Sequence, residues 1–272
     1  TSEYPPASLF KLVTMAHAID YKIATLESKW FCSGSIEYAG RTIYCHRKIG
    51  HGLVNFKEAL ERSCNIPFYD IGKRIKIDNL ATYARELGFG SKTGIIFPES
   101  SGLVPTSEWK KRVKGERWWP GETLSCAIGQ SFLLVTPIQI ACMISGICQG
   151  YRVTPRILED EPIVTHEINI SKVTLKMLKK CMKGVVSTQG TAQRLNKFKN
   201  IKIYAKTGTA QTSDLSKRTL GGIYLEHGWF VANFKYKDEK PLTIVVFVEH
   251  TGSTSPAITM AKDFMLNYFH LV

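Results

Sequence analysis

A serine and a lysine near the start of the chain have the spacing that nucleophilic catalysis requires. Ser8 and Lys11 form an S-x-x-K pattern, and residues three apart share one face of a helix. A serine hydroxyl becomes a good nucleophile when a neighbouring base takes its proton. A buried lysine beside a second cation has a lowered pKa and can be that base. The pair therefore indicates acyl transfer through Ser8, although an ordinary exposed helix can carry the same two residues.

Two more polar residues suit proton relay and substrate binding. Ser63 and Asn65 flank Cys64 in a short link between two helices expected within residues 53–75. The Ser63 hydroxyl can pass a proton between Lys11 and a leaving amine, and the Asn65 side chain can hold a substrate amide. Serine and asparagine are also favoured as helix caps, so this S-x-N pattern has a structural alternative.

A third motif follows a segment that alternates like a strand from Ile201. The motif consists of Lys206, Thr207, Gly208 and Thr209. A strand edge can pair with an extended peptide, and a glycine lets that peptide approach the backbone. The lysine and the two threonines offer a cation and hydroxyls to a peptide carboxylate. A polar turn after a strand is the structural alternative.

The same motif completes the expected electrostatics of acyl transfer. Lys206 is a candidate for the second cation that lowers the pKa of Lys11. The backbone N–H groups of Ser8 and Thr209 would form an oxyanion hole, which is usually a large contribution to such reactions.

The order S-x-x-K, S-x-N, K-T-G resembles that of serine β-lactamases and penicillin-binding proteins. Each motif alone is weak evidence for this resemblance, but all three motifs in this order are specific evidence for it. The chain is most similar to class B penicillin-binding proteins of the elongation type (penicillin-binding protein 2). Further segments carry the resemblance along nearly the whole chain: Tyr4–Ser8, Gly50–Gly52, Glu108–Lys110, Trp119–Glu122, Ala127–Gln130, Thr136–Gln139 and Gly190–Ala192.

The resemblance implies a peptidoglycan D,D-transpeptidase that faces the periplasm. A D-Ala-D-Ala stem peptide would acylate Ser8, an amine of a neighbouring stem would accept the acyl group, and β-lactams would acylate the same serine. The implied partners are a glycan polymerase of the rod complex and its scaffold proteins, with an anchor in the inner membrane upstream. No organic cofactor is implied. Two residues depart from the family pattern, because Ala7 and Ser131 stand where glycines are usual.

The expected fold is α+β, with an antiparallel sheet flanked by helices. Periodicity predicts helices over 7–21, 78–86, 136–148, 172–187 and 257–269, and strands over 201–206, 229–236 and 242–248. Residues 91–123 read as loop and 28–56 as an irregular insert. We expect one transpeptidase domain over 1–272. Because the family places two strands before the nucleophile, we also expect the sheet to lack its N-terminal strands.

Four residues have the chemistry of a structural metal site. Cys32, Cys45, His51 and Cys64 form the pattern C-x12-C-x5-H-x12-C, and three cysteines with one histidine are a known zinc ligand set. Elongation-type relatives resemble it with Asp, Asp, His and Cys at matching places. We favour structural zinc joining the insert to the loop of Ser63. The alternative is a Cys32–Cys45 disulfide.

The amino-acid composition limits the classes of partner that the protein can have. Lysine and arginine number 36 against 23 acidic residues, a net charge of +13. Such a charge favours anionic partners or reflects a solvated basic surface. No nucleic-acid motif is present, and no apolar stretch reaches the roughly 18 residues of a membrane span.

Three other functions share the motif trio. A serine β-lactamase needs a residue that delivers water for deacylation, and only Glu99, Glu108 and Glu122 in the loop region offer a carboxylate there. A D,D-carboxypeptidase uses water as acceptor, and a β-lactam sensor domain stops after acylation. The metal ligands and the loop motifs favour the transpeptidase.

Overall fold

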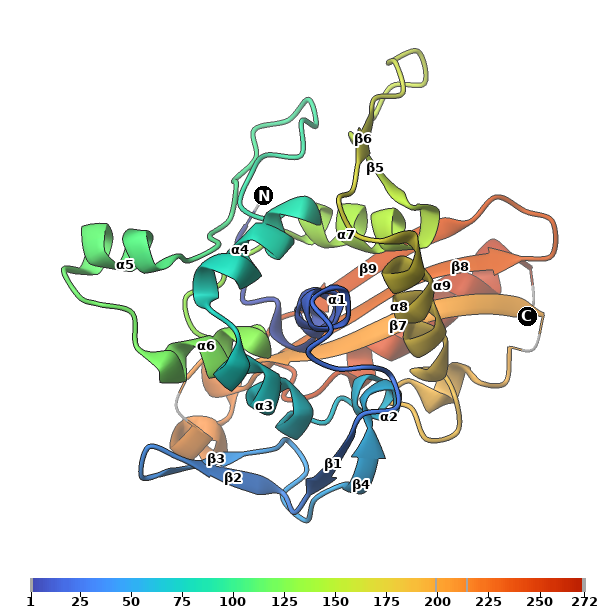
Figure 1. Ribbon diagram of the computed structural model, residues 1–272. Helices are drawn as coiled ribbons and strands as arrows, with labels where there is room; N and C mark the ends of the chain where they lie inside the picture. The colour runs from blue at the N-terminus through green and yellow to red at the C-terminus, as the bar shows by residue number, and fades with distance from the viewer. Residues whose placement is uncertain (1, 199, 214, 271–272) are drawn as a thin grey trace.

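The computed structural model describes residues 2–198, 200–213 and 215–270. Its two main layers are a three-stranded antiparallel sheet and a layer of helices (Figure 1). The helices are α1 Lys11–Asp20, α2 Phe56–Glu61, α3 Ile66–Arg74, α4 Ile77–Glu86, α5 Ser107–Lys114, α6 Pro120–Ala127, α7 Pro137–Gln149, α8 Lys172–Gly184 and α9 Ser255–Tyr268. The strands are β1 Lys29–Cys32, β2 Ser35–Tyr38, β3 Arg41–Tyr44, β4 Gly52–Asn55, β5 Tyr151–Val153, β6 Thr165–Glu167, β7 Ile201–Ala210, β8 His227–Tyr236 and β9 Leu242–Val248.

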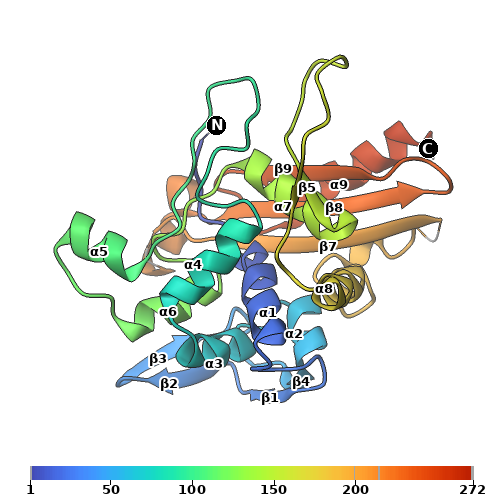
Figure 2. The ribbon, with the colours of Figure 1, turned by 45° about the horizontal axis from the view of Figure 1, so that its top comes forward.

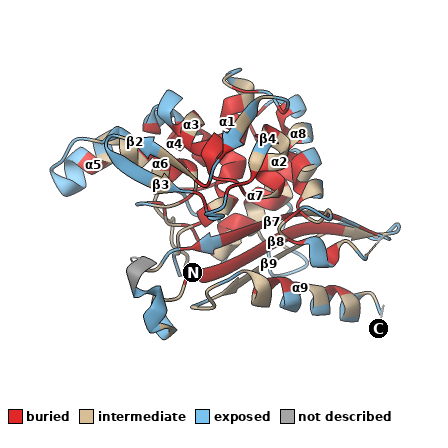
Figure 3. Cartoon of the chain, turned by 90° about the horizontal axis from the view of Figure 1, so that it is seen from below, coloured by how far each residue is buried: buried red, intermediate tan, exposed pale blue. Residues whose placement is uncertain are grey.

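The main sheet has the strand order β7-β8-β9, and both pairs are antiparallel. The central strand β8 is buried from His227 to Phe234, as expected for a strand covered on both faces. Figure 3 shows α9 on one face of the sheet and the helical layer on the other. Among the described strands β7 forms one edge, so the Lys206–Thr209 motif lies on an edge strand. The predicted α+β class and the three predicted strands are confirmed.

Helix α1 forms the centre of the helical layer. Its residues from Lys11 to Ala18 are all buried, and it contacts α3, α4 and α8 (Figure 2). A helix that is apolar on nearly every side belongs inside a protein. The nucleophile turn that precedes α1 is therefore held in the middle of the molecule, against β7.

Two predicted irregular regions contain regular structure. Within 28–56, β1 pairs with β4 and β2 pairs with β3, which gives two short antiparallel strand pairs, of which β2–β3 is a hairpin. Within 91–123, α5 begins after the Thr106 cap and α6 begins at Pro120, which occupies the first helical turn. Strands β5 and β6 form a further hairpin that the periodicity did not predict. Across the described residues, no helix has both the length and the hydropathy needed to cross a membrane.

Candidate active site and adjoining cysteine cluster

The candidate nucleophile, Ser8, lies in a tight turn rather than in an α-helix. Ser8 is the middle residue of a 3-10 turn, Ala7–Leu9, and α1 begins only at Lys11. The prediction of one helix over 7–21 is therefore wrong at its start. The Ala7 N–H donates to the Gly129 carbonyl at 2.8 Å. A Cβ on Gly129 would lie 1.9 Å from the Ala7 oxygen, so this close backbone contact requires glycine.

Lys11 is wholly buried and points at the S-x-N turn. Its Nζ donates to the Asn65 Oδ1 at 2.7 Å, to the Ser63 carbonyl at 2.7 Å and to the Ser63 Oγ at 3.3 Å. Three acceptors match the three donors of a lysine ammonium. Burial lowers the pKa of Lys11 to about 8, because a low-dielectric interior disfavours the charged amine.

Lys206 reaches the same hydroxyl from the opposite side. Its Nζ donates to the Ser63 Oγ at 3.0 Å and to the Thr207 carbonyl at 3.0 Å. Burial, and then the charge of Lys11, hold the pKa of Lys206 well below its usual value. The structure thus brings the three motifs together around Ser63, with two buried lysines sharing one hydroxyl.

One predicted contact is absent. Among the described residues Lys11 makes no hydrogen bond to Ser8; its bonds go to Ser63 and Asn65. The Lys11 ammonium is occupied by the acceptors of Ser63 and Asn65, although residues three apart share one side of the 3-10 turn at Ser8. The turn is nevertheless packed against β7, because a Cβ on Gly208 would lie 3.3 Å from the Leu9 side chain and 3.4 Å from the Pro6 oxygen.

The K-T-G segment is held by residues whose contacts the motifs did not predict. The Thr191 and Thr207 hydroxyls are 2.6 Å apart, and the Gln130 Nε2 donates to the Thr209 carbonyl at 3.3 Å. The Trp229 Nε1 donates to the Pro5 carbonyl at 3.1 Å, which ties β8 to the nucleophile turn. Thr191 and Gln130 fall in segments that resemble the family, but nothing in their spacing indicates the contact.

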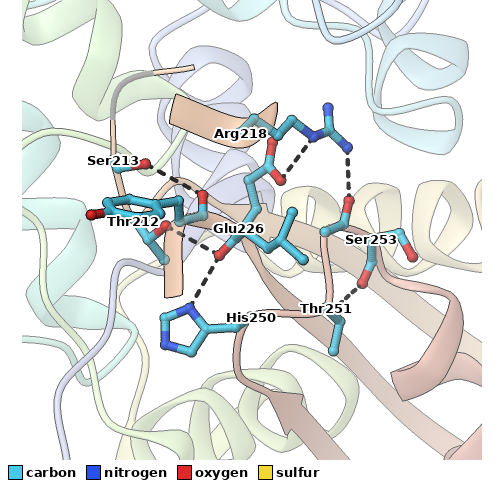
Figure 4. A network of polar contacts seen from close by, with 10 residues as sticks. Thr212, Ser213, Arg218, Glu226, His250, Thr251 and Ser253 are labelled. Atoms are coloured by element: carbon cyan, nitrogen blue, oxygen red, sulfur yellow. Dashed lines mark hydrogen bonds and ion pairs between the residues drawn. The ribbon is translucent and has the colours of Figure 1, made fainter. Parts of the chain in front are cut away.

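The connection that follows β7 is fixed to the loop between β9 and α9 (Figure 4). The Arg218 Nη2 donates to the Gly252 carbonyl at 3.0 Å, and its Nε lies 3.3 Å from the Glu226 carboxylate. The His250 N–H donates to the His227 Nδ1 at 3.0 Å. These contacts join two loops beyond the end of β7 that carries Thr209.

The four candidate metal ligands converge. Cys32 ends β1, Cys45 follows β3, His51 precedes β4 and Cys64 lies between α2 and α3. Their ligand atoms all lie within 4.8 Å of one another. The His51 Nδ1 is 3.5 Å from the Cys32 Sγ and 3.6 Å from the Cys45 Sγ, and the Cys45 and Cys64 sulfurs are 3.9 Å apart.

The three separations given above are close to those around a tetrahedral zinc ion. Zn–S and Zn–N bonds of about 2.3 and 2.05 Å put tetrahedral ligands about 3.8 Å apart for two sulfurs and about 3.5 Å for sulfur and nitrogen. The two cysteines of the alternative disulfide, Cys32 and Cys45, are free thiols in the structure. The Asn65 N–H also donates to the Cys45 Sγ at 3.3 Å, so the cluster touches the catalytic turn directly.

His46 also lies beside this cluster. Its Nδ1 is 3.8 Å from the Cys45 Sγ, and its ring centroid is 5.0 Å from that of His51. The spacing of this histidine from the other candidate ligands does not predict the contact. Its position next to Cys45 in the chain was the one available signal.

Comparison with known proteins agrees with this geometry. Residues 1–266 match the penicillin binding protein transpeptidase domain. This chain belongs to that family. The family prediction made from the motifs is confirmed.

Curated relatives of the transpeptidase domain share its sequence over nearly all of the chain. The peptidoglycan D,D-transpeptidase MrdA of Acinetobacter baumannii is 30% identical over 95% of this chain and 41% of its own length. The protein of that name from Haemophilus influenzae is 28% identical over 98% of this chain and 44% of its own length. The chain therefore spans less than half the length of these two relatives.

Solved structures give the same fold. PBP2 from Helicobacter pylori superposes with a TM-score of 0.89 and 29% identity, covering 100% of this chain and 50% of that protein. PBP2 from Pseudomonas aeruginosa, solved in complex with WCK 5153, superposes with a TM-score of 0.81 and 26% identity, covering 98% and 61%. These likenesses confirm the predicted transpeptidase/β-lactamase-like class.

Proposed function

We propose that this transpeptidase domain cross-links peptidoglycan by transferring an acyl group from a D-Ala-D-Ala stem peptide to an amine on a neighbouring stem. The observation that carries the proposal is the meeting of Lys11, Lys206 and Asn65 around the Ser63 turn, directly beside the Ser8 turn and the K-T-G edge. The relatives named D,D-transpeptidase support the reaction class.

In the first half of the reaction the Ser8 oxygen attacks the carbonyl carbon between the two D-alanines. The Ser8 proton passes to Lys11, whose lowered pKa leaves part of the population neutral at physiological pH. Backbone N–H groups of Ser8 and Thr209 receive the oxyanion. The C–N bond then breaks, the terminal D-alanine leaves with a proton, and an ester to Ser8 remains.

Ser63 is suited to carry that proton to the leaving amine. Its oxygen accepts from both lysines, so its own hydrogen is left free to be donated into the cleft. In the second half the acceptor amine attacks the ester, gives up its proton along the same path and releases Ser8. Thr207, Gly208 and Thr209 present an edge on which the donor peptide pairs as an added strand.

The rival functions fit the structure less well. A β-lactamase needs a carboxylate that positions water beside Ser8. Glu99 instead accepts from Thr93 and from the Gly94 N–H, both at 2.7 Å. Glu122 is paired with Lys110 and accepts from the Trp119 N–H at 2.9 Å. Two of the three glutamates considered from the sequence therefore form hydrogen bonds and ion pairs within the loop region.

The cysteine cluster is proposed to hold one structural Zn²⁺ through Cys32, Cys45, His51 and Cys64. Four protein ligands leave no open coordination position. The ion would fix Cys64 between Ser63 and Asn65, and so fix the turn to which Lys11 is bonded. Its role is to position the catalytic turn, while the chemistry remains with the serine and the lysines.

The partners and location follow from the relatives. PBP2 from Helicobacter pylori has been solved in complex with MreC, and a related structure is described as a peptidoglycan synthase complex that coordinates polymerization and crosslinking. By analogy we assign this domain to the periplasmic side of the inner membrane, in a complex with a glycan polymerase and a scaffold protein.

Product analysis tests this proposal. Incubation with uncross-linked peptidoglycan should yield dimeric stem peptides and one free D-alanine for each cross-link. D-Alanine release without dimers would instead establish a D,D-carboxypeptidase. A Ser8→Ala variant serves as the control and should release no D-alanine.

A further inference from the structure

A row of lysines follows one face of α8, outside the catalytic site. Lys172, Lys176, Lys179 and Lys183 are separated by four, three and four residues, which places them on one side of a helix. Lys180 lies next to this row. All except the half-buried Lys179 are exposed, and Figure 2 shows their helix alongside β7.

The five lysines carry unpaired charge. Within residues 2–198, 200–213 and 215–270, none of them forms an ion pair. Lys57 and Lys110, by contrast, are paired with carboxylates. The Nζ of Lys179 donates to the Cys148 carbonyl at 3.1 Å, which orients it without neutralising it. Like charges one helical turn apart repel each other, so the row does not serve the stability of α8.

These side chains line a hollow that contains no acidic residue. Its volume is about 600 Å³, and all five lysines contribute to its walls together with Tyr204 and the end of α7. A second hollow of about 430 Å³ shares Lys180 and Lys183 and adds the Lys57–Glu61 ion pair, which carries no net charge. Volumes of this size accommodate a peptide segment or a small ligand. The two hollows together form a basic groove along α8.

The basic groove runs beside the strand that carries the catalytic lysine. Tyr204 lines it and lies two residues before Lys206. Alternate residues of a strand point to the same side and are about 7 Å apart. Lys206 donates to the Ser63 Oγ at 3.0 Å. A polymer held in the groove therefore lies near the catalytic centre.

We propose that the basic groove binds the carboxylates of stem peptides that neighbour the reacting one on the same glycan strand. This inference rests on the proposed function, in which each donor peptide ends in a carboxylate. Lysine places a flexible point charge rather than a rigid fork, which suits repeated carboxylates at variable positions. The groove is an exosite for the anionic polymer, and the hollow without acidic residues matches that charge.

The test compares two triple variants. Lys172→Gln, Lys176→Gln and Lys183→Gln remove exposed charge from the groove. Lys111→Gln, Lys114→Gln and Lys240→Gln remove the same charge from exposed sites elsewhere. The probe is uncross-linked glycan strands with free carboxylates, and the same strands with those carboxylates amidated. We expect the groove variant to bind free-carboxylate strands about tenfold more weakly, since each exposed pair contributes little. The control triple variant, with its substitutions outside the groove, should bind the strands as tightly as the parent protein. Amidation of the carboxylates should remove the difference in affinity between the groove variant and the parent.

Two results would overturn the exosite. Equal weakening in both variants would show a general charge effect. A groove variant with unchanged strand binding but lost affinity for phosphatidylglycerol vesicles would assign the lysines to a membrane surface. Penicillin acylation of Ser8 is measured in parallel. Failure of acylation in the parent would refute the proposed function, whereas normal acylation with unchanged strand binding would refute the groove alone.

Discussion

Three residues around the nucleophile hold a left-handed backbone that is unusual outside glycine. Ala7, Ser63 and Ser131 have φ values of 50°, 54° and 71°. Such conformations persist where the surrounding structure imposes them, and they cluster at functional sites. Ala7 and Ser131 are also the two positions at which the family pattern has glycine. The sequence departs from the family at the positions where the backbone favours glycine.

Restoring those glycines should stabilise the protein. Ala7→Gly and Ser131→Gly should each raise the free energy of unfolding by about 1 kcal/mol, because a Cβ is disfavoured at positive φ. The matched control is Ala141→Gly in α7, which should lower it by about 1 kcal/mol. Urea unfolding measures all three. If Ala7→Gly lowered the free energy of unfolding as much as Ala141→Gly does, the backbone at Ala7 would not be strained.

The pKa of Lys11 sets the expected pH dependence of acylation. The lowered pKa of about 8 means that the neutral amine, which accepts the Ser8 proton, becomes more abundant as the pH rises. The rate of penicillin acylation should rise about tenfold per pH unit at low pH and level off above about pH 8. Stopped-flow kinetics measures it. Lys11→Arg should abolish the reaction, since arginine stays protonated; a pH-independent rate would exclude Lys11 as the base.

At the scale of elements, the strand pairs β1–β4 and β2–β3 are joined through four side chains. Two-stranded pairs of four-residue strands such as β2 and β3 are only marginally stable by themselves. The cluster of Cys32, Cys45, His51 and Cys64 connects them to the turn between α2 and α3. A metal at this point would stabilise both strand pairs and the turn of Ser63 and Asn65 together.

Purified protein should therefore contain about one zinc ion per chain by elemental analysis. Cys45→Ser should release the metal and lower the free energy of unfolding by more than about 3 kcal/mol, because zinc-binding energy is folding energy. Cys148→Ser, outside the cluster, should keep the metal. A Cys32–Cys45 disulfide in a peptide mass map would contradict the site.

The long elements and the two helices within 53–75 were predictable from the sequence, whereas the short strands before β7 and the helices α5 and α6 were not. Alternation along β7, the short apolar run of β9 and the apolar periods of α1 and α7 indicate those elements locally. Helix α5 has eight residues, of which only Lys110 is buried, so it shows almost no apolar period. In α6, Pro120 was interpreted as a loop residue, although proline also favours the first turn of a helix.

At the scale of the whole molecule, the proposed catalytic site is built from three distant parts of the chain. Residues 8–11, 63–65 and 206–209 meet because α1 lies at the centre of the helical layer and β7 lies at the edge of the sheet. Motif order predicted that these residues belong together. It did not predict that Lys11 bonds to the S-x-N turn instead of Ser8, because that choice depends on the long-range packing that brings the turn between α2 and α3 to Lys11.

The intact mass after addition of a penicillin tests the central claim most directly. Ser8 should gain one intact drug mass in a long-lived ester, located by peptide mapping, and Ser8→Ala should gain none while keeping its thermal unfolding transition. An adduct that persists in Ser8→Ala, or one that turns over with continuous drug hydrolysis, would contradict a transpeptidase that uses this serine.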